Sequence, residues 1–120
     1  MAEILIIDDD PDVREVMNAA LEMAGHHVRE AQDGIEGLAM ARQHHPTVVA
    51  TDIVMPEQEG GQVIRQLRRE LPGISILAVS GAARRDLYLK IAEQFGADAV
   101  LAKPFTPDDL TNAVGGLLTR

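Results

Sequence analysis

Five polar residues stand directly after short apolar segments, and their types suit phosphoryl chemistry at a metal ion. They are Asp8, Asp9, Asp52, Ser80 and Lys103. Three carboxylates brought close together repel one another, and a hard divalent cation relieves that repulsion. Mg²⁺ accepts one or two carboxylates together with waters and a phosphate. A carboxylate is also a nucleophile toward phosphorus, so an aspartate here could form an aspartyl phosphate.

Lys103 and Ser80 complete the set that phosphoryl transfer requires. An ammonium and a hydroxyl, acting with a metal ion, would each contact an equatorial phosphoryl oxygen and so neutralise and position the group. Asp10, the third aspartate of the run, is better suited to capping a helix. Acidic side chains favour helix N-termini, where they accept hydrogen bonds from the first N–H groups.

Short apolar runs alternate with amphipathic ones, which predicts five strand–helix units and an α/β fold. The strands are too apolar to be solvated on either face, so we expect a parallel sheet covered on both sides. With right-handed crossovers, the favoured arrangement is a flavodoxin-like doubly wound sheet of order 2-1-3-4-5, which binds ligands beyond the carboxyl ends of its strands. The predicted strands are Glu3–Ile7, Val28–Ala31, Thr47–Thr51, Ser75–Val79 and Ala99–Ala102.

Proline and glycine set the expected helix boundaries. Pro11 begins the first helix and Gly25 follows its end. Asp33 and Gly34 are interpreted as a turn, and a loop is expected over Met55–Gly61. Apolar residues at helical spacing mark the later helices: Ile35, Leu38 and Ala39; Val63, Ile64, Leu67 and Leu71; Leu87, Ile91 and Phe95; and Leu110, Ala113, Val114 and Leu117.

Composition and charge exclude several classes of protein. The 120 residues are 46% hydrophobic and 25% charged, which is ordinary for one globular domain, here predicted to span residues 1–120. A net charge of -8 and 2% aromatic residues disfavour nucleic acid and anionic membranes as partners. The absence of cysteine excludes disulfides and fits a reducing cytoplasm. The N-terminal apolar run ends in aspartates and has no basic flank, so it is neither a signal peptide nor a membrane span.

Four segments together make the chain resemble the receiver domains of two-component response regulators, which include the single-domain chemotaxis regulators. The segments are ILIIDDDPDVR (4–14), VVATDIVMPEQEGG (48–61), ILAVSG (76–81) and LAKPF (101–105). The resemblance implies phosphorelay signal transduction in the cytoplasm. It implies a domain that catalyses only its own phosphorylation and dephosphorylation and is not a conventional enzyme.

Carried over position by position, the resemblance implies a role for each site residue. Asp52 would be the phosphoacceptor. Asp9 would bind Mg²⁺ directly, with Mn²⁺ as a substitute, Asp8 would act largely through a metal-bound water, and the backbone carbonyl of Val54 would be a further ligand. Ser80 would move toward the phosphoryl group and Lys103 would pair with it. The bond between Lys103 and Pro104 is usually cis in the family.

The resemblance also implies partners and a switch. The phosphoryl donor would be a sensor histidine kinase or a phosphotransfer protein, and the output an unknown partner or a C-terminal output domain. The expected output face comprises the last two strands and last two helices, with Arg84, Tyr88 and Leu89 as readout residues. The family usually has an aromatic residue three positions before the lysine, where this chain has Val100.

Other functions of the same fold fit the residues less well. A flavin-binding protein needs a hydroxyl- and glycine-rich loop after the first strand, and here that loop is acidic. An aspartate-nucleophile phosphohydrolase needs a longer chain and usually Thr or Val where Asp12 stands. An adaptor with a vestigial site is disfavoured by the complete residue set. The chain could be a stand-alone regulator or the N-terminal part of a longer one.

Overall fold

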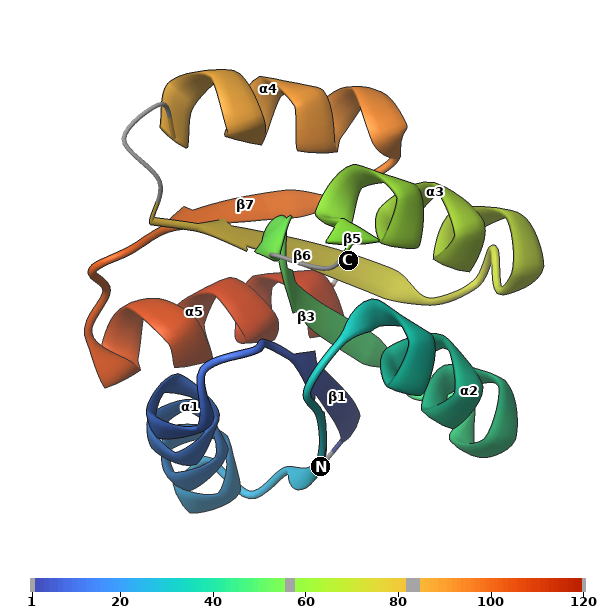
Figure 1. The fold of residues 1–120 in the computed structure, drawn as a ribbon. Coiled ribbons are helices and arrows are strands. Elements are labelled where there is room, and N and C mark those ends of the chain that lie inside the picture. Colours follow the sequence, from blue (N-terminus) through green and yellow to red (C-terminus); the bar gives the residue numbers. More distant parts are fainter. Residues whose placement is uncertain (1, 56–57, 82–84, 120) are drawn as a thin grey trace.

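The computed structural model describes residues 2–55, 58–81 and 85–119. Within them, five parallel strands form one sheet in the order β2-β1-β3-β6-β7 (Figure 1). The strands are β1 (Glu3–Ile7), β2 (His27–Ala31), β3 (Val48–Asp52), β6 (Ser75–Ser80) and β7 (Ala99–Ala102). This is the doubly wound, flavodoxin-like order predicted from the sequence, so the prediction of the fold is confirmed.

Helices cover both faces of the sheet, as continuous apolar strands require. Alternate residues of β1 point to opposite faces: Ile4 and Ile6 join one core cluster, and Leu5 and Ile7 join the other. The first cluster packs against α1 (Pro11–Met23) and α5 (Pro107–Leu118). The second packs against α2 (Gly34–His44), α3 (Gly60–Glu70) and α4 (Arg85–Phe95) (Figure 1). Among the described residues, no helix is both long enough and apolar enough to cross a membrane.

The first helix begins and ends as the sequence predicts. Asp10 is its N-cap, and the Asp10 carboxylate accepts a hydrogen bond of 2.9 Å from the backbone N–H of Asp12. Pro11 is the first helical residue. Gly25 follows the C-terminus with a φ of +95°, a conformation that costs glycine little.

The start and the buried face of α2 differ from the prediction. Asp33 does not form a free turn: its side chain caps α2 by accepting a 2.8 Å hydrogen bond from the N–H of Glu36. Ile35 is 70% exposed instead of buried. Gly37 is buried, and it lies so close to β1 that a Cβ atom there would be 2.4 Å from Ile7 Cδ1. Only a residue without a side chain allows this close approach, which the apolar spacing alone does not reveal.

The segment predicted as a loop over Met55–Gly61 contains regular structure. β4 (Val54–Met55) pairs antiparallel with β5 (Gln58–Glu59), and α3 already begins at Gly60. Pro56 and Glu57 lie outside the described residues. Strands of two residues are too short to show the alternation by which a strand is detected in a sequence.

Candidate functional site

Three carboxylates meet at the carboxyl edge of the sheet, and we call this group the acidic pocket. Asp8 follows β1 directly, Asp9 comes next, and Asp52 is the last residue of β3. One carboxylate oxygen from each lies within 4.8 Å of the others. Asp8 and Asp52 are 1% and 7% exposed, whereas Asp9 is exposed. The acidic pocket is therefore buried at Asp8 and Asp52 and open to solvent at Asp9.

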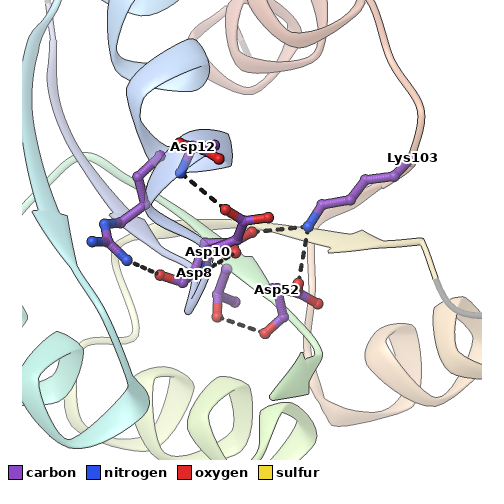
Figure 2. A network of polar contacts seen from close by, with 7 residues as sticks. Asp8, Asp10, Asp12, Asp52 and Lys103 are labelled. Atoms are coloured by element: carbon purple, nitrogen blue, oxygen red, sulfur yellow. Dashed lines mark hydrogen bonds and ion pairs between the residues drawn. The ribbon is translucent and has the colours of Figure 1, made fainter. Parts of the chain in front are cut away.

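Lys103, which follows β7, bridges two of these carboxylates. Its Nζ donates to Asp8 Oδ2 at 2.9 Å and to Asp52 Oδ2 at 3.0 Å (Figure 2). Burial alone would lower the pKa of the Lys103 ammonium, but the hydrogen bonds and charges of Asp8 and Asp52 outweigh it and raise that pKa above its ordinary value. Lys103 is thus held as a cation between the two aspartates.

The backbone around Lys103 directs its side chain into the pocket. The Lys103 N–H donates to the carbonyl oxygen of Ser80 at 2.8 Å. The lysine stem then passes over Gly81, where a Cβ atom would lie 2.9 Å from Lys103 Cβ and 3.2 Å from Lys103 Cδ. Only a residue without a side chain leaves this path open. The peptide bond between Lys103 and Pro104 is cis, as the resemblance implies.

Ser80 lies at the same edge of the sheet. It is the fully buried last residue of β6, opposite Ala102 of β7. Asp52 is opposite Val79, so Ser80 is one residue further along the neighbouring strand. The structure therefore places Asp8, Asp9, Asp52, Ser80 and Lys103 at the carboxyl ends of neighbouring strands.

The other predicted residues have less complete descriptions. Val54 lies in β4, two residues after Asp52. Val100 is a half-buried residue of β7, opposite Ala78, and packs against the core cluster beneath α3 and α4. Arg84 lies outside the described residues, as do the side chains of Tyr88 and Leu89.

Two further residues donate hydrogen bonds to the backbone carbonyl groups of the aspartates and were not predicted from the sequence. Arg14 Nη1 donates to the backbone carbonyl oxygen of Asp8 at 2.6 Å. The buried Thr51 hydroxyl donates to the backbone carbonyl oxygen of Asp52 at 3.1 Å. Arg14 is six positions from Asp8 and Thr51 appears in the sequence as an ordinary strand residue, so nothing in the sequence pattern signals either contact.

A surface pocket of about 430 Å³ opens beside Lys103. It lies between α1 and the connection from β7 to α5, and its lining is mainly apolar: Val13, Val16, Met17, Gly81, Lys103, Pro104 and Phe105. Val16, one of the lining residues, is 57% exposed. An apolar contact surface thus adjoins the acidic pocket.

The donor set of the acidic pocket fits Mg²⁺. Three carboxylates against one ammonium leave two uncompensated negative charges. All the candidate ligand atoms are oxygens, which suits a hard divalent cation, and the exposed side at Asp9 leaves room for the waters that Mg²⁺ retains.

The fold and the acidic pocket define an α/β domain with a cation site at the carboxyl ends of its strands, and comparison with known proteins identifies its family. The family model for the response regulator receiver domain matches residues 4–115, so the chain belongs to that family. The family consists of two-component signalling domains and not of conventional enzymes. An acidic cluster such as that of Asp8, Asp9 and Asp52 is typical of a receiver-domain Mg²⁺ site.

Similar sequences include longer transcriptional regulators. The chain is 38% identical over 121 residues to the DNA-binding dual master transcriptional regulator RpaA of Synechocystis sp., covering 100% of this chain and 50% of that protein. It is 37% identical over 118 residues to the response regulator MprA of Mycobacterium sp. strain KMS, covering 98% of this chain and 50% of that protein. The chain thus spans about half the length of these relatives.

Similar solved structures include proteins of about the same length. A response regulator receiver domain protein from Clostridium thermocellum superposes with a TM-score of 0.92 at 30% identity, covering 100% of this chain and 96% of that one. The chemotaxis protein CheY4 of Vibrio cholerae superposes with a TM-score of 0.89 at 28% identity, covering 98% of both chains.

Proposed function

We propose that this receiver domain is a phosphorelay switch in which Asp52 accepts a phosphoryl group from a histidine kinase or a phosphotransfer protein. One observation carries the proposal. Lys103 Nζ lies within hydrogen-bond distance of both Asp8 and Asp52, in a pocket whose three carboxylates surround one small volume. Such a site offers a nucleophile, a fixed cation and a place for a divalent cation within a few ångströms.

The reaction forms one bond and breaks one. An Asp52 carboxylate oxygen attacks phosphorus in line with the leaving group, and the bond from phosphorus to the donor's imidazole nitrogen breaks. The electron pair of that bond stays on the nitrogen. Lys103, which in the resting site pairs with Asp52, moves its hydrogen bond to a phosphoryl oxygen and neutralises part of the charge.

The remaining residues hold the cation and detect the product. Asp9 would hold Mg²⁺ directly, Asp8 would hold it largely through water, and the Val54 carbonyl would be a further ligand. When bound, the cation would neutralise charge on the phosphoryl oxygens. Ser80, buried beside Asp52, would donate its hydroxyl hydrogen bond to the phosphoryl group once that group is present.

Movement of Ser80 would then alter the output face, which comprises α4, β7 and α5 together with the end of β6. Val100 occupies the family's usual aromatic position and is short and stiff about its single torsion. The change is therefore carried mainly by the connection from β6 to α4 and by α4, with Arg84, Tyr88 and Leu89 as the readout residues.

The similar proteins also suggest what the receiver domain controls. RpaA, a transcriptional regulator, and the response regulator MprA are each about twice this length, which supports control of a partner or a C-terminal output domain. We propose that residues 1–120 form one receiver domain and that it acts in the cytoplasm, where sensor kinases present their phosphohistidines. The apolar pocket beside Lys103 offers a contact surface to a phosphoryl donor approaching Asp52.

The proposal is tested by phosphorylation with acetyl phosphate, followed by intact-protein mass spectrometry. The parent should gain one phosphoryl group in the presence of Mg²⁺ and none in excess chelator. Asp52→Asn should gain none. Asp10→Asn is the matched control, because Asn caps a helix as well as Asp does and the same loop loses one carboxylate. It should be labelled like the parent. Labelling of Asp52→Asn at the parent's rate would refute the assignment.

A further inference from the structure

The contact between Arg14 and the backbone of Asp8 has no part in the chemistry described above. Arg14, near the start of α1, directs Nη1 at the Asp8 carbonyl oxygen, 2.6 Å away. Its Nε lies 3.3 Å from Oε1 of Glu30 on β2. Asn18 Nδ2 donates to the other carboxylate oxygen of Glu30 at 2.6 Å. Two residues of α1 thus hold Glu30, and Glu30 in turn holds the guanidinium against the Asp8 carbonyl.

This contact fixes a peptide that joins two carboxylates of the acidic pocket. The Asp8 N–H donates to Ala31 at the end of β2, and the strand pairing of β1 ends one residue earlier, at Ile7. Arg14 donates to the Asp8 carbonyl oxygen one residue beyond the last paired residue of β1. Because a peptide unit is planar, fixing the Asp8 carbonyl also fixes the direction in which the chain continues to Asp9. A hydrogen bond from a charged donor is stronger than a neutral one.

We propose that Arg14 is a positioning residue for the cation site, holding the Asp8–Asp9 peptide so that both carboxylates face Asp52. The inference rests on the proposed function, since it concerns the Mg²⁺ that the acidic pocket would bind. Residues that orient metal ligands through hydrogen bonds typically change metal affinity by one to two orders of magnitude when they are lost.

Charge and position predict opposite effects for the loss of Arg14. Arg14 is a cation close to an acidic pocket, so Coulomb's law alone predicts that removing it strengthens the attraction for Mg²⁺. Positioning predicts the reverse, because Asp8 and Asp9 lose their fixed arrangement. The sign of the change therefore separates the two effects without reference to catalysis.

The test is isothermal titration calorimetry, in which MgCl₂ alone is titrated into the full chain. Arg14→Gln should bind Mg²⁺ about tenfold more weakly than the parent. Arg14→Lys keeps the charge but cannot contact Asp8 and Glu30 with a rigid fork, and it should lose less affinity. Arg29→Gln is the control: Arg29 precedes Glu30 on β2, pairs with Glu3 at 2.7 Å, and its loss removes the same charge. It should not weaken Mg²⁺ binding.

Far-UV circular dichroism and urea unfolding without Mg²⁺ establish that each variant is folded. If Arg14→Gln does not fold, Arg14→Lys still tests the inference. Its charge is unchanged, so any loss of Mg²⁺ affinity comes from the altered position of Asp8 and Asp9. Parent-like or tighter binding by the Arg14 variants would overturn the inference, as would an equal loss in Arg29→Gln. A parent that binds no Mg²⁺ would instead overturn the proposed function, so the two failures are distinguishable.

Discussion

The side chain of Lys103 reaches the acidic pocket across the bare backbone of Gly81. A Cβ atom at Gly81 would lie 2.9 Å from Lys103 Cβ, which is closer than two such atoms normally approach. The atom in the way is the root of the lysine side chain, so the stem cannot swing aside without moving its base. The position of the ammonium between Asp8 and Asp52 therefore depends on a glycine that follows a different strand, β6.

Gly81→Ala should displace Lys103 and slow phosphorylation of Asp52 by acetyl phosphate about tenfold, because misplaced charge stabilises the transferring group less well. Rates are measured by intact-protein mass spectrometry over time. Gly73→Ala is the control, since a Cβ atom there meets nothing within 4 Å. Equal rates for Gly81→Ala and Gly73→Ala would show that the lysine does not need this path.

Arg68 should be a large contributor to stability at the opposite edge of the sheet. Its guanidinium donates to the carbonyl oxygens of Pro72, Ile74 and Gly96, at distances of 2.8–3.2 Å, and pairs with Asp98. Arg68→Ala removes the guanidinium donor from three carbonyl groups, two of them in partly buried contacts, and removes the charge partner of Asp98. We expect a loss of about 3 kcal/mol in the free energy of unfolding.

Urea unfolding followed by circular dichroism measures the effect of Arg68→Ala. Arg69→Ala serves as the comparison, because Arg69 is the exposed neighbour on the same helix and should change stability by no more than about 0.5 kcal/mol. Similar midpoints for the two variants would contradict the role assigned to Arg68.

The ion pair between Arg42 on α2 and Glu70 on α3 should make part of the stability depend on pH. Arg42 Nε and Nη2 lie 2.7 and 2.8 Å from the two carboxylate oxygens of Glu70. Hydrogen bonds from Arg42 and Gln66 lower the pKa of Glu70 from 4.5 to about 2. A lowered pKa stabilises the folded state above the unfolded value, and this stabilisation is lost as pH falls from 4.5 to about 2.

Glu70→Gln should therefore be less stable than the parent at pH 7, and the difference should shrink as the pH is lowered through this range. Urea midpoints at several pH values give the comparison. Glu15→Gln, at an exposed position on α1, controls for the change in net charge. If the difference in urea midpoint between the parent and Glu70→Gln stays constant down to pH 2, the ion pair between Arg42 and Glu70 does not cause that difference.

Activation should move α4 more than Val100. Val100 is half-buried against the core cluster beneath α3 and α4, and a β-branched side chain sweeps little volume when it rotates. With beryllofluoride and Mg²⁺, amide resonances of Ser80, Gly81 and α4 should shift strongly, and the Val100 methyl resonances only modestly. Asp52→Asn should show neither change. A large rotamer change at Val100 with α4 unmoved would refute this route.

The sheet and most of the candidate site could be predicted because both depend on chain order. Apolar strands must be covered on both faces, and parallel strands bring residues that follow them, such as Asp8, Asp52 and Lys103, to one edge. The buried face of α2 could not be predicted, because it depends on the contact of Gly37 with Ile7 across the core.

The contacts that refine the site also depend on tertiary geometry. Arg14 reaches the Asp8 carbonyl only because α1 turns it back over the end of β1, and Glu30 holds it there from another strand. Gly81 is informative only once the course of the Lys103 stem is known. Spacing along the sequence carries neither fact.

The chemical identity of the phosphorylated residue tests most directly whether Asp52 is the phosphoacceptor. Borohydride reduces an acyl phosphate to an alcohol, so treatment of the phosphorylated chain should convert one aspartate to homoserine. Peptide mass spectrometry should then locate homoserine at position 52, only after phosphorylation in the presence of Mg²⁺. Homoserine at position 8 or 9 instead, or a phosphoryl group that resists reduction, would contradict the assignment of Asp52 as the acceptor.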